Sequence, residues 1–126
     1  MKGTDAIFVY GLLKPGLSLY HLVEPYVTRS AAGTARGRLF VAEYPAAVFG
    51  ADGEIDGVVL WLDPSRLDEA LRVLDEAEDE GVMYERRTIE VSTHEGTVSS
   101  HAYHWLLTVD GCPDAGRSWP PGQMSE

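Results

Sequence analysis

Short apolar runs that are rich in β-branched and aromatic residues, separated by glycine and proline, predict β-strands over most of the first half of the chain. The first of these runs, residues 7–10, stops at Gly11, and a loop over residues 12–16 follows it. The pattern therefore predicts a strand that leads directly into a turn at Gly11. Three further strands are predicted at residues 34–41, 46–49 and 55–62, with a turn over residues 51–54.

The spacing of apolar residues changes to a helical period at Asp63-Pro64. Asp63 is a predicted N-cap, and proline suits the first helical position, which Pro64 would occupy. Leucine and alanine then recur at intervals of three and four residues, which predicts a main helix over residues 64–79. A shorter helix is predicted over residues 18–23, because Pro25 would end it soon afterwards.

Strand character returns after Gly81. Residues 86–92 and 98–107 lie on either side of a turn at residues 94–96, and they are predicted to form a β-hairpin with a longer loop. The order of elements along the chain is thus strands, one main helix and strands again.

This order predicts an α+β fold in which a curled, barrel-like mixed β-sheet surrounds one core, with the helix packed on one side. The alternative is an open sandwich without the helix. A chain of 126 residues has the size of a single domain. We place that domain at residues 1–109 and expect residues 110–126, where glycine, proline, serine and aspartate dominate, to form an irregular C-terminal tail.

The charge of the chain and the length of its apolar runs limit the kinds of molecule that the protein is expected to bind. Ten basic and twenty acidic side chains give a formal net charge of -10, which would repel nucleic acid and anionic membranes. No apolar run approaches the length of about 18 residues that crosses a bilayer, and residues 1–5 show no signal-peptide features. We therefore expect a cytoplasmic protein that binds neither nucleic acid nor membrane.

Glu78 is the one acid of the predicted helix that falls in the middle of its apolar side. On a helical wheel with Leu67 at zero, Leu71 lies at about 40°, Leu74 at about -20° and Glu78 at about 20°. The other acids of this stretch point away from that stripe. Burial raises the pKa of a carboxyl group, which would suit Glu78 to general acid/base catalysis near neutral pH.

Two structural alternatives exist for Glu78. In the first, the helix ends before Glu78 and leaves it in a loop. In the second, Arg86 or Arg87 forms an ion pair with it. Periodicity alone does not separate these alternatives from the catalytic interpretation, because helix ends are predicted only to within several residues.

An ordered set of short motifs provides a second line of argument. The motifs are FVYGLLKPG at residues 8–16, GRLF at 37–40, YPA at 44–46, LDEAE at 74–78 and YER at 84–86. In this order and at these separations the chain resembles the gamma-glutamylcyclotransferase-like family, which includes the gamma-glutamylamine cyclotransferases. The resemblance covers residues 7–107.

The resemblance implies a compact barrel-like fold with a cavity, in which the turn of Tyr10, Gly11, Leu12 and Leu13 lines the substrate site through its backbone. It also implies that Glu78 is the general acid/base. The expected reaction converts a gamma-glutamyl amine or gamma-glutamyl peptide to 5-oxoproline and a free amine. Because the α-amine of the substrate attacks the side-chain carbonyl of the same molecule, this reaction needs no metal and no cofactor.

Tyr84 and Tyr103 fall where members of the family place aromatic or hydroxyl groups around the pocket, so each is a candidate substrate contact. The alternative is that both are ordinary half-buried strand tyrosines. Two positions depart from the pattern of the family. Leu12 stands where threonine or serine is more common, and Asp79 stands where a glycine commonly follows the catalytic glutamate.

The sequence supports a metal site and two other functional classes less strongly. His101 and His104 would face opposite sides of a strand, and Cys112 is the only cysteine, so we expect no metal site. A non-catalytic small-molecule or protein-binding module on the same fold is the second hypothesis. An interaction domain with an exposed aromatic patch at Trp105 and Trp119 is the third. The expected partner is a small-molecule gamma-glutamyl substrate, and a homodimer is a possible assembly.

Overall fold

The structure is a computed structural model that describes residues 4–120 of the chain. Its strands are β1 (Ala6–Val9), β2 (Val27–Val41), β3 (Pro45–Leu62), β4 (Tyr84–Thr93), β5 (Gly96–Trp105) and β6 (Asp114–Gly116). Its helices are α1 (Tyr20–Val23) and α2 (Leu67–Ala77), together with single 3₁₀ turns at Glu24–Tyr26 and Pro64–Arg66.

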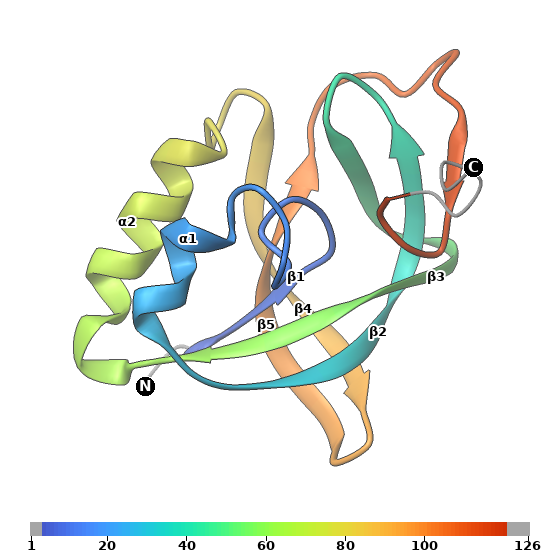
Figure 1. Cartoon of the computed structure of the whole chain (residues 1–126). Helices are drawn as coiled ribbons and strands as arrows, with labels where there is room; N and C mark the ends of the chain where they lie inside the picture. Colours follow the sequence, from blue (N-terminus) through green and yellow to red (C-terminus); the bar gives the residue numbers. More distant parts are fainter. Residues whose placement is uncertain (1–3, 121–126) are drawn as a thin grey trace.

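Five strands close into a barrel. The pairing order is β3-β1-β5-β4-β2, and β2 pairs in turn with β3, which completes the circle. The β1–β5 pairing is parallel and the other pairings of the barrel are antiparallel. Both helices lie together on one side of this mixed sheet (Figure 1). The predicted α+β fold with a curled, barrel-like sheet is therefore confirmed.

The strand β3 continues through residues 51–54, where the sequence predicts a turn. Its pairing with β2 changes register between Arg36 and Gly37, and residues 50–53 bulge out of the ladder at this point. The two glycines of the bulge have positive φ values of 90° and 121°. The prediction of a turn was therefore wrong, because these glycines mark a bulge within a continuous strand.

The core fills the barrel interior and the space beneath α2. The buried face of α2 consists of Ala70, Leu71 and Leu74, as the apolar spacing predicts. The largest fully buried apolar side chains are Phe8, Ile7, Leu39, Ile55, Leu60, Leu62 and Leu74. Within residues 4–120, no helix is long and apolar enough to cross a bilayer.

Asp63 caps the start of the main helical segment. Its Oδ1 accepts a hydrogen bond of 2.9 Å from the backbone N–H of Ser65, and Pro64 occupies the first helical position. One carboxylate oxygen thus satisfies a backbone donor that the helix start leaves free. The predicted start of the helix is confirmed.

The segment after Val109 is more ordered than the irregular tail that the sequence predicts. The strand β6 pairs with β2 on the outside of the barrel, with Gly116 opposite Leu39. Arg117 then binds the Asp56 carboxylate through two nitrogen atoms, at 2.9 and 3.1 Å. These contacts attach residues 114–117 to the barrel although their composition is typical of a loop. Residues 121–126 of the predicted tail lie outside the described residues.

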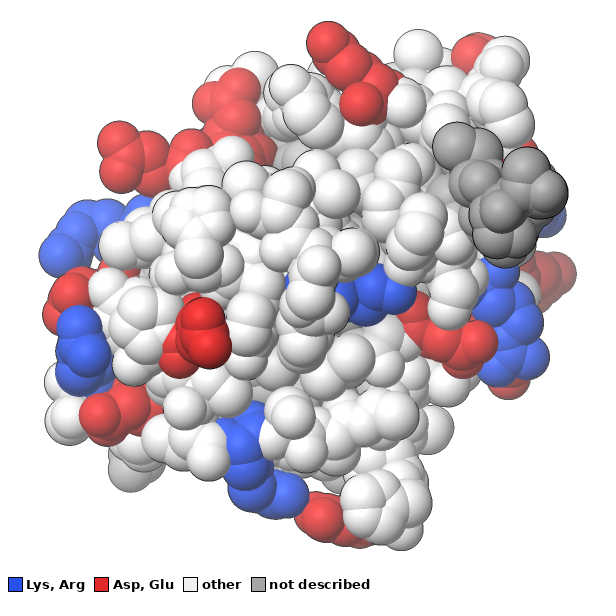
Figure 2. All heavy atoms as spheres, viewed as in Figure 1, with Lys and Arg blue, Asp and Glu red and all other residues white. Residues whose placement is uncertain are grey.

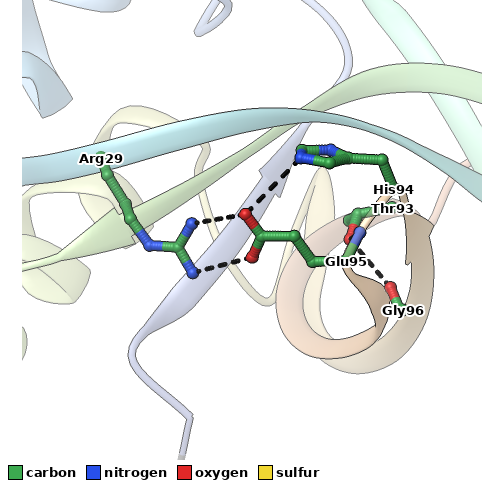
Figure 3. A network of polar contacts seen from close by, with 5 residues as sticks. All are labelled: Arg29, Thr93, His94, Glu95 and Gly96. Atoms are coloured by element: carbon green, nitrogen blue, oxygen red, sulfur yellow. Dashed lines mark hydrogen bonds and ion pairs between the residues drawn. The ribbon is translucent and has the colours of Figure 1, made fainter.

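An ion pair joins β2 to the tip of the β4–β5 hairpin (Figure 3). The two terminal nitrogens of Arg29 each lie 3.3 Å from an oxygen of Glu95, and the guanidinium also stacks over the ring of Trp61 at 3.7 Å. The Thr93 hydroxyl donates to the backbone oxygen of Gly96 at 2.8 Å and closes the hairpin turn. Because these groups are exposed, we expect the ion pair to stabilise the fold only modestly.

Candidate active site

A cavity of about 250 Å³ opens into the protein beside the C-terminal end of α2. Regions that are distant in sequence form its walls: β1 with the turn that follows it, the residue before α1, the start of β3, the end of α2 with the loop after it, and the facing strands β4 and β5. The lining residues are Phe8, Val9, Tyr10, Gly11, Leu12, Leu13, Leu19, Tyr44, Pro45, Ala77, Glu78, Asp79, Met83, Tyr84 and Tyr103. The structure thus brings together all seven residues that the sequence and the resemblance indicate.

Glu78 lies at the point where α2 ends. The helix stops at Ala77, earlier than predicted, and Glu78 is its C-cap. The backbone N–H of Glu78 still donates to the oxygen of Leu74 at 2.9 Å, as it would within a helix. This bond keeps Glu78 one turn beyond Leu74 and on the same side. Glu78 therefore lines the cavity although the helix ends just before it.

A Schellman motif ends the helix and fixes the backbone beyond Glu78. The N–H of Glu80 donates to the oxygen of Asp75 at 3.0 Å, and the N–H of Asp79 donates to the oxygen of Glu76 at 3.3 Å. Asp79 takes the left-handed position of this motif with a φ of 53°, a conformation that glycine adopts most readily. The backbone conformation at position 79 therefore favours glycine, the residue that the family pattern has where this chain has Asp79.

Burial raises the pKa of Glu78 from an ordinary 4.5 to about 7. Within residues 4–120, the Glu78 carboxylate forms no hydrogen bond and no ion pair. Arg86 instead binds Asp75, with distances of 2.8 and 3.0 Å, and Arg87 binds Glu85 at 2.6 Å. The predicted alternative of an ion pair between Glu78 and an arginine is therefore wrong.

Three tyrosines form the closed end of the cavity, and all three are buried. The Tyr10 hydroxyl donates to the backbone oxygen of Tyr103 at 2.8 Å, and the Tyr84 hydroxyl donates to that of Pro45 at 2.5 Å. The Tyr103 hydroxyl donates to Asp75 Oδ1 at 2.7 Å. Burial is the main cause that raises the pKa of each tyrosine. In each of these three bonds the hydroxyl group is the donor. A phenol oxygen that donates its proton in this way has lone pairs that can accept a hydrogen bond.

The turn after β1 forms a second wall. The N–H of Lys14 donates to the oxygen of Gly11 at 3.0 Å, so residues 11–14 form a β-turn. In the described part of the chain, the N–H groups of the two central residues, Leu12 and Leu13, have no partner in the protein. A Cβ atom added at Gly11 would lie 2.9 Å from the Cβ of Pro45, so close packing is one reason for glycine there.

Sequence reasoning missed several lining residues. Met83 lies in a loop where no local pattern marks it, and Leu19 falls in the predicted short helix, whose apolar spacing does not show that it faces the cavity. Tyr44 and Pro45 belong to one of the motifs that carry the resemblance, but nothing in the sequence indicates that they face the cavity. All four are placed by the tertiary fold, which brings separate loops to one end of the barrel.

The weaker candidates lie outside the cavity. His101 contacts the backbone oxygen of Thr4 at 2.9 Å, and Nδ1 of His104 accepts from the N–H of Phe49 at 3.2 Å. No group of three or more potential metal ligands occurs among the described residues. Trp105 is only 5% exposed, so it cannot form the exposed aromatic patch of the third hypothesis.

Known structures share this fold. An AIG2-like protein from Mus musculus has a TM-score of 0.75 and 23% sequence identity, covering 94% of this chain and 89% of that chain. An uncharacterized protein from Pyrococcus horikoshii has a TM-score of 0.61 and 25% identity, covering 91% and 85%. YkqA from Bacillus subtilis has a TM-score of 0.68 and 26% identity, covering 84% of this chain and 37% of that chain.

The family assignment rests on the sequence match over nearly the whole chain. A comparison with curated protein sequences gave no match. The family model described as "Gamma-glutamyl cyclotransferase, AIG2-like" matches residues 7–121. That span contains the turn after β1, the end of α2 and the rest of the cavity lining. The chain therefore belongs to the gamma-glutamyl cyclotransferase, AIG2-like family.

Proposed function

We propose that this protein is an amine-releasing cyclotransferase that converts a gamma-glutamyl amine or gamma-glutamyl peptide to 5-oxoproline and the free amine. The observation that carries the proposal is Glu78, a carboxylate in the cavity with no ion-pair partner among the described residues and a pKa of about 7. A group with this pKa exists in both protonation states near neutral pH, which suits it to accept a proton and return it. Membership of the family supports the same conclusion.

The proposed reaction needs one proton-transfer group. Glu78 accepts a proton from the α-ammonium group of the substrate, and the freed nitrogen attacks the carbonyl carbon of the side chain to form a five-membered ring. The bond from that carbon to the leaving nitrogen then breaks as Glu78 returns the proton to it. The ring nitrogen gives up a second proton in the same step, and the released amine takes it and leaves as an ammonium ion. No water is consumed. Because attacking and attacked groups belong to one molecule, holding the substrate in a folded conformation supplies much of the rate enhancement.

The turn at residues 11–14 is the proposed site of oxyanion stabilisation. The attack places negative charge on the carbonyl oxygen, and hydrogen-bond donors aimed at that oxygen lower the barrier. Leu12 and Leu13 line the cavity, and their N–H groups have no protein partner in the described residues. Since backbone donors do not depend on the side chain, leucine at position 12 is compatible with this role.

The tyrosines are proposed to orient the α-ammonium group beside Glu78. The Tyr84 hydroxyl donates its proton to a backbone oxygen, so a lone pair of its oxygen can accept a hydrogen bond from the substrate, and the buried Tyr10 hydroxyl packs behind it. An ammonium group carries three donors and no acceptor, which matches this closed end of the cavity. Tyr103 is proposed to close the end wall, because its hydroxyl is already held by Asp75.

A product assay tests the proposal. The purified protein would be incubated separately with a gamma-glutamyl alkylamine, a gamma-glutamyl dipeptide and glutathione, and 5-oxoproline would be measured. We expect release of 5-oxoproline and free amine in equal amounts from at least one of them. If one of these compounds binds without release of 5-oxoproline, the protein is a non-catalytic binding module instead. A homodimer and a cytoplasmic location stay predictions from the sequence.

A further inference from the structure

We infer that the cavity selects gamma-glutamyl derivatives of alkyl diamines, in which a methylene chain carries a second ammonium group, and that the Asp79 carboxylate binds that group. The inference rests on the proposed function, because it concerns the leaving amine of the same reaction. It follows from the order of buried and exposed residues along the cavity, from the charges of its lining, and from the apolar surface between its two ends.

The cavity has a closed end and an open end. Its closed end is formed by buried residues, among them Tyr10, Tyr84 and Tyr103. The lining residues that are exposed to solvent, Tyr44, Ala77 and Asp79, mark the mouth. With the gamma-glutamyl group held beside the tyrosines, the leaving amine would extend toward the mouth.

The charges of the lining are all negative. Of the fifteen lining residues in the described part of the chain, only Glu78 and Asp79 carry a charge. The nearby cations are held elsewhere, since Arg86 binds Asp75 and the Lys14 ammonium donates to a backbone oxygen. Figure 2 shows acidic side chains along the upper edge of the molecule, where no basic side chain is visible. A leaving group with a carboxylate would therefore meet repulsion and no partner.

The wall between the ends is apolar. Leu12, Leu19 and Met83 line the cavity and are each partly exposed, so a bound molecule can reach them. Burying methylene groups against such side chains is favourable, because it removes apolar surface from water. An unbranched alkyl chain fits this surface, whereas a peptide backbone would bring polar groups that find no partner there.

Asp79 is held in a position to bind a cation at the end of that chain. The Schellman motif fixes its backbone through hydrogen bonds of 3.3 and 3.0 Å on either side. Its carboxylate forms no ion pair or hydrogen bond within residues 4–120. A short side chain on a fixed backbone loses little conformational entropy when it binds a ligand. The acid next in sequence to Glu78 is thus available for recognition.

Three amides that differ only at the far end of the amine test the inference. They are the gamma-glutamyl amides of 1,4-diaminobutane, butylamine and 4-aminobutyric acid, whose far ends are cationic, neutral and anionic. We expect kcat/KM to fall in that order, by about two- to fivefold at each step, because an exposed ion pair contributes no more than this. The differences should shrink as salt concentration rises.

Asp79→Asn is the matching variant, because asparagine also tolerates the left-handed backbone conformation. It should bring the ratio of kcat/KM for the cationic amide to that for the anionic amide close to one. Glu90→Gln is the control, since Glu90 is exposed and lies outside the cavity but its loss changes the net charge equally. This control should leave the ratio unchanged.

Binding separates the inference from the proposed function. The affinity of each amide would be measured by calorimetry with the wild-type protein and with Glu78→Gln. If the amides bind in the expected order but release no 5-oxoproline, the proposed function fails and the inference stands. If they are cyclised at equal kcat/KM, or the anionic amide is preferred, the inference is overturned and the function stands. If none of them binds, the inference is wrong, and the assay with the gamma-glutamyl dipeptide and glutathione decides the proposed function.

Discussion

Arg86 holds Asp75 and leaves Glu78 free. Its Nε and Nη2 atoms lie 2.8 and 3.0 Å from the two oxygens of the Asp75 carboxylate, which also accepts the Tyr103 hydroxyl at 2.7 Å. This group of contacts attaches the last turn of α2 to β4 and β5. Asp75 in the last turn of α2 and Glu78 at its C-cap thus have opposite environments, since within residues 4–120 Asp75 is paired and Glu78 is not.

Replacing Glu78 by glutamine should slow catalysis strongly. The change preserves shape and hydrogen-bonding capacity but removes the group that accepts the proton. We expect kcat to fall by about 10² to 10⁴-fold, the usual contribution of general acid/base catalysis. The measurement is 5-oxoproline release from a substrate that the wild-type protein cyclises. Wild-type turnover by this variant would exclude Glu78 as the catalyst.

The same substitution should stabilise the fold at neutral pH. The pKa of Glu78 is raised to about 7 in the folded protein, so the folded state holds this proton more tightly than the unfolded chain does. Ionisation of Glu78 therefore destabilises the wild-type fold as pH rises from 4.5 to about 7. Glutamine stays uncharged at every pH, so the variant does not lose this stability as pH rises.

Urea unfolding of both proteins between pH 4 and 8 measures this difference. The free energy of unfolding of Glu78→Gln, relative to wild type, should increase by roughly 2–3 kcal/mol across the range and then level off. A variant that is less stable than wild type at pH 8 would mean that the carboxylate has a structural partner.

The pH dependence of activity should follow the ionisation of Glu78. Because Glu78 must be ionised to accept a proton, kcat/KM should rise with pH and level off above the pKa of about 7. A steady-state profile from pH 5 to 9 tests this. An acidic limb centred near 4.5 would indicate that burial does not set the behaviour of this carboxylate.

Replacing Asp79 by glycine should raise stability. Asp79 has a φ of 53°, and glycine adopts this conformation without the steric cost that any side chain incurs. We expect an increase in the free energy of unfolding of about 0.5–1 kcal/mol. Asp79→Ala is the control, because it removes the same charge but keeps a Cβ atom, and it should be no more stable than wild type. Equal stability of the two variants would assign the effect to charge.

Replacing Gly11 by alanine should impair both stability and activity. The added Cβ would lie 2.9 Å from the Cβ of Pro45, whose backbone oxygen holds the Tyr84 hydroxyl. Displacement of Pro45 should lower the free energy of unfolding by about 1–3 kcal/mol, as overpacking does, and raise KM. Thermal unfolding and steady-state kinetics measure the two effects. Unchanged stability would show that Pro45 can move without cost.

The sequence predicted the parts of the site that depend on local pattern. Glu78 was found because helical periodicity places it on the side of Leu71 and Leu74, and this direction survives although the helix ends at Ala77. The turn at Gly11 was found because a β-rich run stops there. Both predictions rest on residues close together in the chain, where backbone geometry decides the outcome.

Features that depend on contacts between distant segments were not predictable. The pairing of Arg86 with Asp75 requires β4 to lie against the end of α2, whereas the pairing considered from the sequence was one of Arg86 or Arg87 with Glu78. The bulge at residues 50–53 has the composition of a turn, and only its pairing with β2 shows that the strand continues. The strand β6 is likewise defined by its partner, since three residues carry no pattern of their own.

The length of α2 is a functional constraint as well as a structural one. Each residue of a helix turns the chain by about 100° and advances it by about 1.5 Å. One residue inserted between Asp63 and Glu78 would therefore rotate the carboxylate out of the cavity without weakening the helix. An insertion in the bulge at residues 50–53 would move no residue of the cavity lining. A protein design based on this barrel can thus vary the bulge at residues 50–53 but must preserve the number of residues in α2.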